Sequence, residues 1–386
     1  MAESRRSFLN KLGSSMAALP IINAFSDQKA NASTFNRTEH FNNFNAQINS
    51  NPNRAKSNLS SPLENHLRSN FSLGYTPIET PGIRTLSYEM DGPIKVFHLT
   101  AEPVTITFPD MSDPNGTQRR PIFAWGYNGS VIGPTIEAVE GDHVRIVVQN
   151  NLPDPTTVHW HGLHIPIEMD GVEGISQKPI EPSDSFVYEF TLEQHGTYFY
   201  HPHFMGAKQV GMGMVGFFIV HPKNPPTWYQ VDHDYTYLFQ TWMIQPGSPV
   251  PDTMEMSNFN YFTMNGRAGP DVTPMKAKSG EKIRIRCLNL SMLTHPVHLH
   301  GHSYKVTEYG AGFLPESQHI LANTINISSA EVRTFDFTAG RPGKWLLHCH
   351  FMHHVMNDMH RRPIPGNGSG HSAHQMGGMS TWIEVS

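Results

Sequence analysis

The chain has 386 residues, which is long enough for two domains of ordinary size. Its formal net charge of -5 and its pI near 6.6 give no basic surface for nucleic acid, so a nucleic-acid-binding role is excluded. Charged residues make up only 16% of the chain, whereas Gly and Pro number 31 and 30, which is typical of short strands and many turns. The 24 histidines are the anomaly, because an ordinary surface needs far fewer.

The N-terminus resembles a twin-arginine export signal. Arg5 and Arg6 precede a mildly apolar stretch from Leu12 to Phe25, and Ala30-Asn31-Ala32 has the small residues of a cleavage site. The apolar stretch is shorter than the roughly 20 residues of a membrane span, and no other segment could cross a bilayer. We expect residues 1–32 to be a signal peptide, with a charged N-terminal arm as the alternative, and the protein to be periplasmic or otherwise exported.

The next segment, residues 33–73, is rich in Asn and Ser and contains few aliphatic residues. Such a composition cannot bury enough apolar surface to fold alone. We expect a flexible leader.

The rest of the chain contains an internal repeat. "GDHVRIVVQNNLPDPTTVHWHGLH" from Gly141 aligns without a gap with "GEKIRIRCLNLSMLTHPVHLHGHS" from Gly280. "GTYFYHPHFM" from Gly196 aligns in the same way with "GKWLLHCHFM" from Gly343. A repeat period this long indicates two copies of one domain rather than a solenoid.

Each copy shows alternating segments, such as "VRIVVQN" and "KIRIRCLN", with turn residues between them. This pattern predicts half-buried strands of a β-sandwich. We therefore expect an all-β protein with two tandem Greek-key β-sandwich domains, residues 74–222 and 227–386, joined by the short "KNPP" connection. Cys287, in the second of these segments, is expected to be a small buried hydrophobic residue.

Two His-x-His pairs recur at equivalent positions of the two copies. In a strand, residues i and i+2 share a face, so each pair directs both imidazoles to one side. The pairs contribute His159, His161, His201, His203, His298, His300, His348 and His350. Eight imidazoles can hold three metal ions with two, three and three ligands each, but imidazole suits copper, zinc, iron and nickel alike.

A further group of residues distinguishes the second copy. It has His295, Cys349 and His354 where the first copy has Thr156, Pro202 and Ala207. Cys349 lies between two strand histidines and must point to the opposite face. Together with Met359 the group offers two imidazoles, one thiolate and one thioether, the ligand set of a blue-copper electron-transfer site.

The motifs "HWHG", "HPH", "HPVHLH" and "HCHFMHHVMNDM" together resemble those of multicopper oxidases, the laccase-like cupredoxin family, over about residues 75–360. The resemblance implies two cupredoxin-like domains and four copper ions per chain. It assigns the type 2 copper to His159 and His298. It assigns the type 3 pair to His161, His201, His203, His300, His348 and His350, and the type 1 copper to His295, Cys349, His354 and Met359. The family spacing after the cysteine favours His354 over its neighbour His353.

The segment "MDGVEGISQKPI" at Met169 also resembles the family. There an Asp, here Asp170, helps to deliver protons to reduced oxygen; a turn-forming Asp-Gly is the alternative. Some relatives carry a carboxylate beside the type 1 ligands, whereas this chain has Phe351, Met352, His353 and Val355 around His354. The resemblance therefore defines no proton route beyond Asp170.

Methionines form a second signal, because thioethers suit Cu(I). The alternatives are core packing for the first set and a disordered tail for the second. The two sets are Met205, Met212 and Met214 after the "HPH" motif, and His371, His374, Met376 and Met379 in the tail.

The resemblance implies an enzyme that couples one-electron oxidation of a donor, a phenol or Cu(I), to four-electron reduction of dioxygen to water. With Cu(I) as donor it would serve copper tolerance. One alternative is a copper-sequestering protein without turnover. Another is a two-domain copper nitrite reductase, which would have the type 1 cysteine in the first domain and no type 3 pair.

The eight histidines divide evenly between the copies, so a shared cluster needs a first domain to meet a second. The short linker near Pro225 and Pro226 favours a meeting between neighbouring chains. Head-to-tail contacts of this kind close into rings, and resemblance to two-domain laccases implies a homotrimer with three intersubunit clusters.

Overall fold

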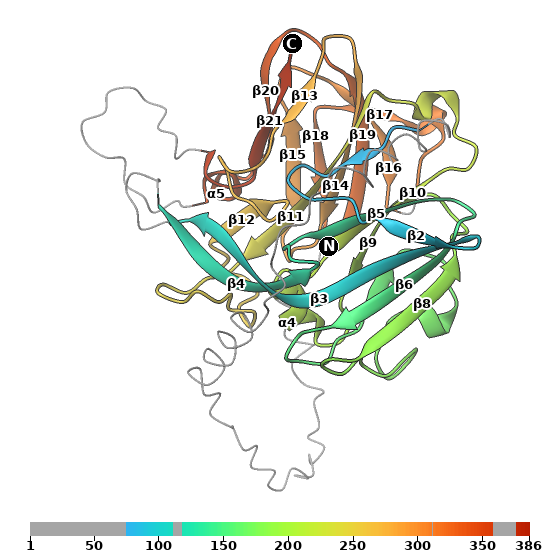
Figure 1. The fold of residues 1–386 in the computed structure, drawn as a ribbon. Helices are drawn as coiled ribbons and strands as arrows, with labels where there is room; N and C mark the ends of the chain where they lie inside the picture. Colours follow the sequence, from blue (N-terminus) through green and yellow to red (C-terminus); the bar gives the residue numbers. More distant parts are fainter. Residues whose placement is uncertain (1–74, 111–117, 311, 358–375) are drawn as a thin grey trace, which may run out of the picture. The chain divides into compact units, whose positions relative to one another are not determined.

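The computed structural model describes residues 75–110, 118–310, 312–357 and 376–386, all of which belong to one compact unit, residues 58–386. The expected signal peptide, the expected leader and Met359 lie outside the described residues. The described chain consists mostly of β-strands, so the all-β prediction is confirmed (Figure 1). None of its helices is both long and apolar enough to span a membrane.

The first copy of the repeat forms two sheets. The larger sheet has the order β2-β3-β6-β8, with β4 paired to β3, and the smaller has the order β5-β10-β9-β7. Their strands are β2 (Tyr88–Asp91), β3 (Ile94–Pro109), β4 (Arg119–Tyr127), β5 (Gly133–Val139), β6 (His143–Asn150), β7 (His159–His161), β8 (Ser185–Thr191), β9 (Gly196–His201) and β10 (Gly216–His221).

The second copy also forms two sheets, one of which includes a short strand from the start of the first copy's range. One has the order β1-β11-β14-β19-β16-β17, with β12 paired to β11, and the other β13-β21-β20-β15-β18. Their strands are β1 (Ile78–Glu79), β11 (His233–Trp242), β12 (Tyr261–Met264), β13 (Met275–Ala277), β14 (Lys282–Asn289), β15 (His295–Leu299), β16 (Tyr304–Tyr309), β17 (Ile320–Ala322), β18 (Thr324–Ile327), β19 (Glu331–Thr338), β20 (Gly343–Cys349) and β21 (Ser380–Val385). Between the strands lie α4 (Gly206–Gly211), α5 (Met352–Met356) and 3-10 turns at Ile167–Met169, Thr227–Tyr229 and Glu316–Gln318.

The equivalent strands β6 and β14 differ in burial. In β6, buried and half-buried residues alternate as predicted. In β14 every residue after Lys282 is buried, so the prediction of a half-buried strand is wrong there. The reason is that both faces are covered: one face carries Ile283, Ile285 and Cys287 into the core, and Arg286 on the other donates to Thr197 of the first copy at 2.8 Å. Cys287 is a free, buried thiol, as predicted.

A shared apolar core joins the two copies. It combines strand residues of the first copy, such as Phe199 and Phe217, with Leu238, Trp242 and Leu288 of the second. The short β1, at the start of the described chain, pairs in parallel with β11. The two copies therefore bury apolar surface against each other as well as within themselves.

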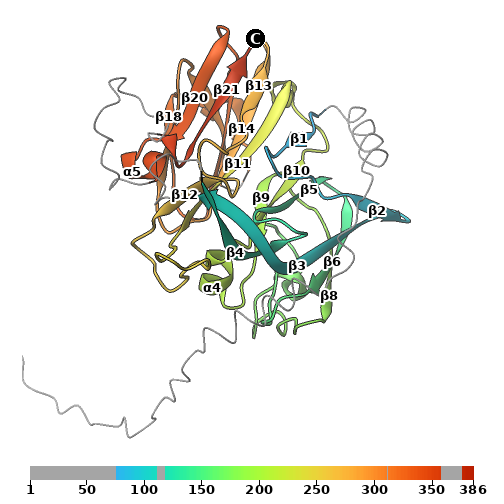
Figure 2. The ribbon, with the colours of Figure 1, turned by 60° about the vertical axis from the view of Figure 1, so that its left-hand side comes forward.

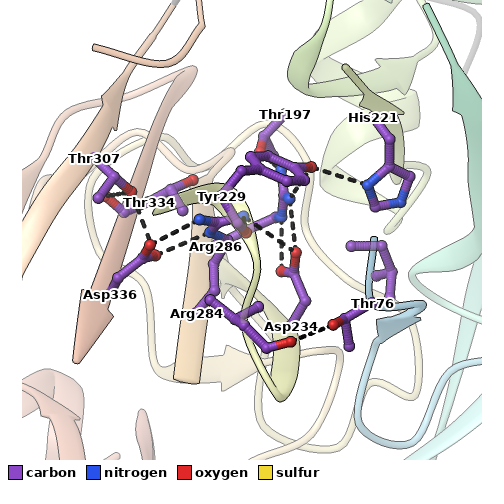
Figure 3. A network of polar contacts seen from close by, with 12 residues as sticks. Thr76, Thr197, His221, Tyr229, Asp234, Arg284, Arg286, Thr307, Thr334 and Asp336 are labelled. Atoms are coloured by element: carbon purple, nitrogen blue, oxygen red, sulfur yellow. Dashed lines mark hydrogen bonds and ion pairs between the residues drawn. The ribbon is translucent and has the colours of Figure 1, made fainter. Parts of the chain in front are cut away.

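A buried polar network crosses the same interface (Figure 3). Arg286 bonds Asp234 through two nitrogens, at 2.8 and 2.7 Å, and also the Tyr229 hydroxyl at 3.1 Å. That hydroxyl lies 2.9 Å from Nδ1 of His221, whose Nε2 lies 2.8 Å from Glu137. Each buried charge thus has a partner, which is what a charge removed from water requires.

Candidate metal centres

Three buried side chains of the second copy converge on one point. Nδ1 of His295 lies 3.1 Å from Nδ1 of His354, and Sγ of Cys349 lies 3.7 and 3.4 Å from these two nitrogens. His295 opens β15, Cys349 ends β20 and His354 belongs to α5. The structure therefore brings together three of the four residues predicted for the type 1 copper; the fourth, Met359, lies outside the described residues.

The surroundings of this trio are apolar. Phe262 stacks on His354 with ring centroids 4.4 Å apart, and Phe239 stacks on His295 at 5.6 Å. Burial lowers the pKa of each imidazole to about 3 and raises the pKa of the Cys349 thiol to about 12. The two neutral imidazoles direct nitrogens at one point beside a sulfur, so the set fits a soft cation that displaces the thiol proton.

The strand parity around Cys349 is as the sequence predicts. Cys349 is fully buried, whereas His348 is half-buried and His350 is exposed. Nδ1 of His348 donates to the Cys349 carbonyl at 2.8 Å, which adds a hydrogen-bonded link to the covalent one.

In the first copy, a neutral polar pair occupies the equivalent place. Thr156 donates from Oγ1 to Oε1 of Gln209 at 2.6 Å, and Nε2 of Gln209 donates to the Pro155 carbonyl at 2.7 Å. Thr156 and Gln209 are both fully buried. At this position the first copy therefore presents a hydroxyl and an amide that bond each other, in place of a thiol and imidazoles.

The four histidines of the first copy gather around the paired strands β7 and β9. The imidazole centroid of His159 lies 5.6, 5.4 and 5.9 Å from those of His161, His201 and His203. Nδ1 of His161 lies 3.4 Å from Nε2 of His201. Ligand atoms of three of these residues, His159, His161 and His201, lie within 4.8 Å of one another.

The second copy repeats this arrangement at β15 and β20. The centroid of His298 lies 4.9, 5.7 and 5.7 Å from those of His300, His348 and His350. Nε2 of His300 lies 3.2 Å from Nε2 of His348.

Hydrogen bonds fix the outward nitrogen of several of these imidazoles. His159 and His298 donate from Nδ1 to the backbone carbonyls of Asp170 and Asn323, both at 2.7 Å. His201 donates from Nδ1 to the carbonyl of the residue that follows it, at 3.0 Å, as His348 does. These bonds leave Nε2 unprotonated, as metal-ligating histidines require. Unprotonated nitrogens that face each other, without a donor between them, fit bound cations.

Burial favours the neutral form of three of these histidines. It lowers the pKa of His201 to about 3 and that of His161 and His348 to about 4, and neighbouring imidazoles add to the effect. Copper ligands must be neutral imidazoles, so protons compete with the metal only in strong acid.

The partners of the histidines could not be read from the sequence. Glu173 accepts from Nδ1 of His203 at 2.9 Å, and Ser291 lies 2.9 Å from Nε2 of His295. The only signal for Ser291 is its proximity in sequence to His295. Asp170 also contacts a histidine of this group: its backbone carbonyl accepts from Nδ1 of His159, and its Oδ1 is 3.4 Å from the same nitrogen.

The two histidine groups make no ring contact with each other among the described residues, although all eight histidines are described. Both groups also include exposed members, His203 in the first and His300 and His350 in the second. Within the described residues the two groups are therefore separate from each other and partly open to solvent.

The methionines after the "HPH" motif are mostly structural. Met212 and Met214 are buried in the core of the first copy, whereas Met205 is exposed. In the tail, Met376 is exposed and Met379 is fully buried, while His371 and His374 lie outside the described residues.

Comparison with known proteins agrees with this geometry. Two family models described as multicopper oxidase match residues 111–225 and 244–368. The solved multicopper oxidase mgLAC is 33% identical, with a TM-score of 0.63 over 75% of this chain and 86% of that one. The blue copper oxidase from Nitrosomonas europaea is 31% identical, with a TM-score of 0.62 over 75% of this chain and 85% of that one.

Curated relatives are longer. Copper resistance protein A of Escherichia coli is 37% identical over 136 residues, which are 35% of this chain and 22% of that protein. The chain spans less than half the length of the curated relatives that it matches. The convergent thiolate–imidazole trio, the paired histidine groups and these matches lead to one conclusion: the chain belongs to the multicopper oxidase family.

Proposed function

We propose that the protein is an exported copper oxidase that passes electrons from a donor to dioxygen. The observation that supports this most strongly is the arrangement at the end of β20. Buried Cys349 points toward His295 and His354, and its two neighbouring histidines point the other way. Copper, when bound, would supply one-electron exchange at the trio and oxygen reduction at the histidine groups, with four ions per chain.

The chain's own residues give this chemistry its direction. Phe239 and Phe262 stack on the two imidazoles of the trio and shield them from water. An electron from the donor must therefore pass through protein atoms to reach the trio. Cys349 connects the trio to His348 and His350 through a few covalent bonds. The His348 bond to the Cys349 carbonyl provides a second, shorter link.

We propose that the cluster is completed between chains. The first-copy histidines of one chain would meet the second-copy histidines of its neighbour, and head-to-tail contacts would close into a homotrimer. The support is that each group is partly exposed and that the described residues show no ring contact between them.

Complementation tests this assembly. A variant lacking His159 and His161 is mixed with a variant lacking His298 and His300 under conditions that exchange subunits. Activity in the mixture supports a shared site, because intact halves can then meet. Inactive mixtures with proven exchange, or a monomer that carries four coppers, would contradict it.

Two donors are compatible with the trio, phenols and Cu(I). Two exposed methionines close to trio residues in sequence favour Cu(I): Met352 begins α5, which contains His354, and Met292 precedes His295 by three residues. Thioethers are suitable ligands for Cu(I). A role in copper tolerance would follow.

The experiment is oxygen uptake by the copper-loaded protein with a phenol and with Cu(I), side by side. Faster uptake with Cu(I), reduced by substituting Met292 and Met352 with Leu, would identify the donor. A protein that binds copper but consumes no oxygen with either donor would be a sequestering protein instead. Reduction of nitrite would indicate the nitrite reductase alternative, although Pro202 in place of a first-copy cysteine argues against it.

We further propose that the carboxylate of Asp170 delivers protons during oxygen reduction. Asp170→Asn removes the carboxylate but keeps the backbone carbonyl that holds His159. Loss of a positioned proton donor should slow oxygen reduction by about 100-fold with copper content unchanged. Equal rates in the variant and the parent would dismiss this role.

Export by the twin-arginine route is proposed from Arg5 and Arg6, which lie outside the described residues. Replacing both with Lys should retain the precursor in the cytoplasm. Normal processing of that variant, measured by fractionation, would exclude the route.

A further inference from the structure

The trio of His295, Cys349 and His354 offers one thiol and two imidazoles, and among the described residues no further His, Cys, Asp or Glu joins it. The family spacing points to Met359 for the weak axial position. We propose that the thioether of Met379, not that of Met359, is the axial ligand. This inference rests on the proposed function, because it concerns the same copper site.

The first argument is strand register. β20 and β21 are antiparallel neighbours, side by side in Figures 1 and 2, with His348 paired to Ser380. Continuing this register by one position places Met379 directly opposite Cys349, whose amide donates to the Met379 carbonyl at 3.1 Å. Residues directly opposite in an antiparallel pair project from the same face, with Cβ atoms about 4.5–5.5 Å apart. The Met379 side chain therefore projects from the face on which Cys349 meets the trio.

The second argument is how closely the chain before β21 packs on α5. The Met379 amide donates to the His354 carbonyl at 2.9 Å, and the amide of Gly378 donates to Val355 at 2.9 Å. A Cβ on Gly378 would lie 2.1 Å from the His354 carbonyl oxygen. Met379 is thus held by its backbone between two residues of the trio, and it is fully buried in the same core cluster as Cys349.

The third argument comes from the repeat. In the first copy, β9 pairs with β10 so that Tyr200 is opposite Gly216. The equivalent pair in the second copy is Leu347 and Thr381. Continuing the first register by two positions places Met214 opposite Pro202. Continuing the second in the same way places Met379 opposite Cys349, so Met214 and Met379 are equivalent. The connection to this strand is longer in the second copy than in the first, so counting residues from Cys349 to Met359 does not reach the strand position that Met214 occupies.

The alternative explanation for the burial of Met379 is that both copies of the repeat place a methionine in the core at this position, without a ligand role. Met214 is as fully buried as Met379 but lies in a copy that has no thiolate. It is therefore the matched control for core packing, and Met359→Leu is the control for the spacing argument.

The test uses the full-length, copper-loaded protein with Met379→Leu, Met379→Gln, Met359→Leu and Met214→Leu. The readouts are copper per chain, the blue absorption band, the type 1 electron paramagnetic resonance signal and the reduction potential. Losing the thioether in Met379→Leu should raise the potential with the blue band retained, because Cu(II) loses a donor. Met379→Gln should lower the potential and change the resonance signal, because an amide oxygen binds Cu(II) more strongly.

A purely structural role would not shift the potential in opposite directions for Leu and Gln. Met359→Leu and Met214→Leu should leave the potential and the resonance signal as in the parent. A shift caused by Met359→Leu, or unchanged values in both Met379 variants, would overturn the proposal. A parent protein without any blue copper would instead refute the proposed function, so the two failures are distinguishable.

Discussion

Thr156 and His295 occupy equivalent positions of the two copies, yet one belongs to a hydrogen-bonded polar pair and the other to a ligand trio. In the first copy the Thr156–Gln209 hydrogen bond satisfies two buried polar groups with each other. In the second, the nearest atoms of His295, Cys349 and His354 lie 3.1–3.7 Å apart and direct donor atoms at a common point. The same strand frame thus supports either a self-satisfied pair or a group that needs a cation to be satisfied.

The largest effect should come from removing the thiolate. Cys349→Ser should abolish the blue colour and reduce oxidase activity by at least ~100-fold, while most of the cluster copper stays bound. Copper analysis and visible spectra measure this. Pro202→Ala, the equivalent change in the first copy, should leave the colour intact. A blue Cys349→Ser protein would mean that the type 1 assignment is wrong.

The two histidine groups differ in the hydrogen-bond partner of one member, and changing that partner should have a smaller effect. Glu173 holds His203, whereas His350, its equivalent, makes no side-chain hydrogen bond among the described residues. Glu173→Ala should weaken copper binding at the cluster by about 10-fold, because loss of such a partner costs 10–100-fold in metal affinity. Copper titration checks this, with Glu173→Gln as the control that keeps an acceptor. Equal affinities in all three proteins would show that the contact does not orient His203.

The close packing of the second copy can be broken at Gly378. Gly378→Ala places a methyl group against the His354 carbonyl, and overpacking of this kind costs about 1–3 kcal/mol. We expect a lower free energy of unfolding and a fraction of chains without blue copper. Gly206→Ala, at the start of α4, meets nothing within 4 Å and should be close to neutral. Chemical denaturation distinguishes the two, and similar midpoints would argue against tight packing at Gly378.

The smallest expected effect on the copper sites comes from changing the neutral pair, Thr156 and Gln209. Thr156→Val leaves Oε1 of Gln209 buried without its donor, which costs about 1–3 kcal/mol. The blue band and the copper count should not change. Adding Gln209→Met should recover part of the lost free energy of unfolding. A change in colour in either variant would contradict the view that the Thr156–Gln209 pair is separate from the copper chemistry.

Much of the site could be predicted because it depends on short-range strand geometry. The alternation of His348, Cys349 and His350 follows from the two-residue period of a strand, and the repeat places both histidine groups. What the sequence could not provide were contacts set by tertiary packing. The carbonyls of Asp170 and Asn323 hold two imidazoles, and β14 is buried on both faces because the first copy packs against it.

The axial ligand shows the same limit. Spacing along the chain selects Met359, because a sequence motif counts residues from Cys349 and takes no account of a longer connection before the next strand. Strand register selects Met379, because the ladder between β20 and β21 ignores the length of the connection. Where a connection varies in length, alignment to the ladder is the better guide.

The apolar core shared by the two copies also determines how the protein unfolds. It includes Phe199, Phe217, Leu238 and Leu288. Because neither copy can leave without exposing this apolar surface, heat or denaturant should melt both in a single cooperative transition. Subunits of an oligomer would then exchange only as whole chains, and domain swapping between chains would not occur.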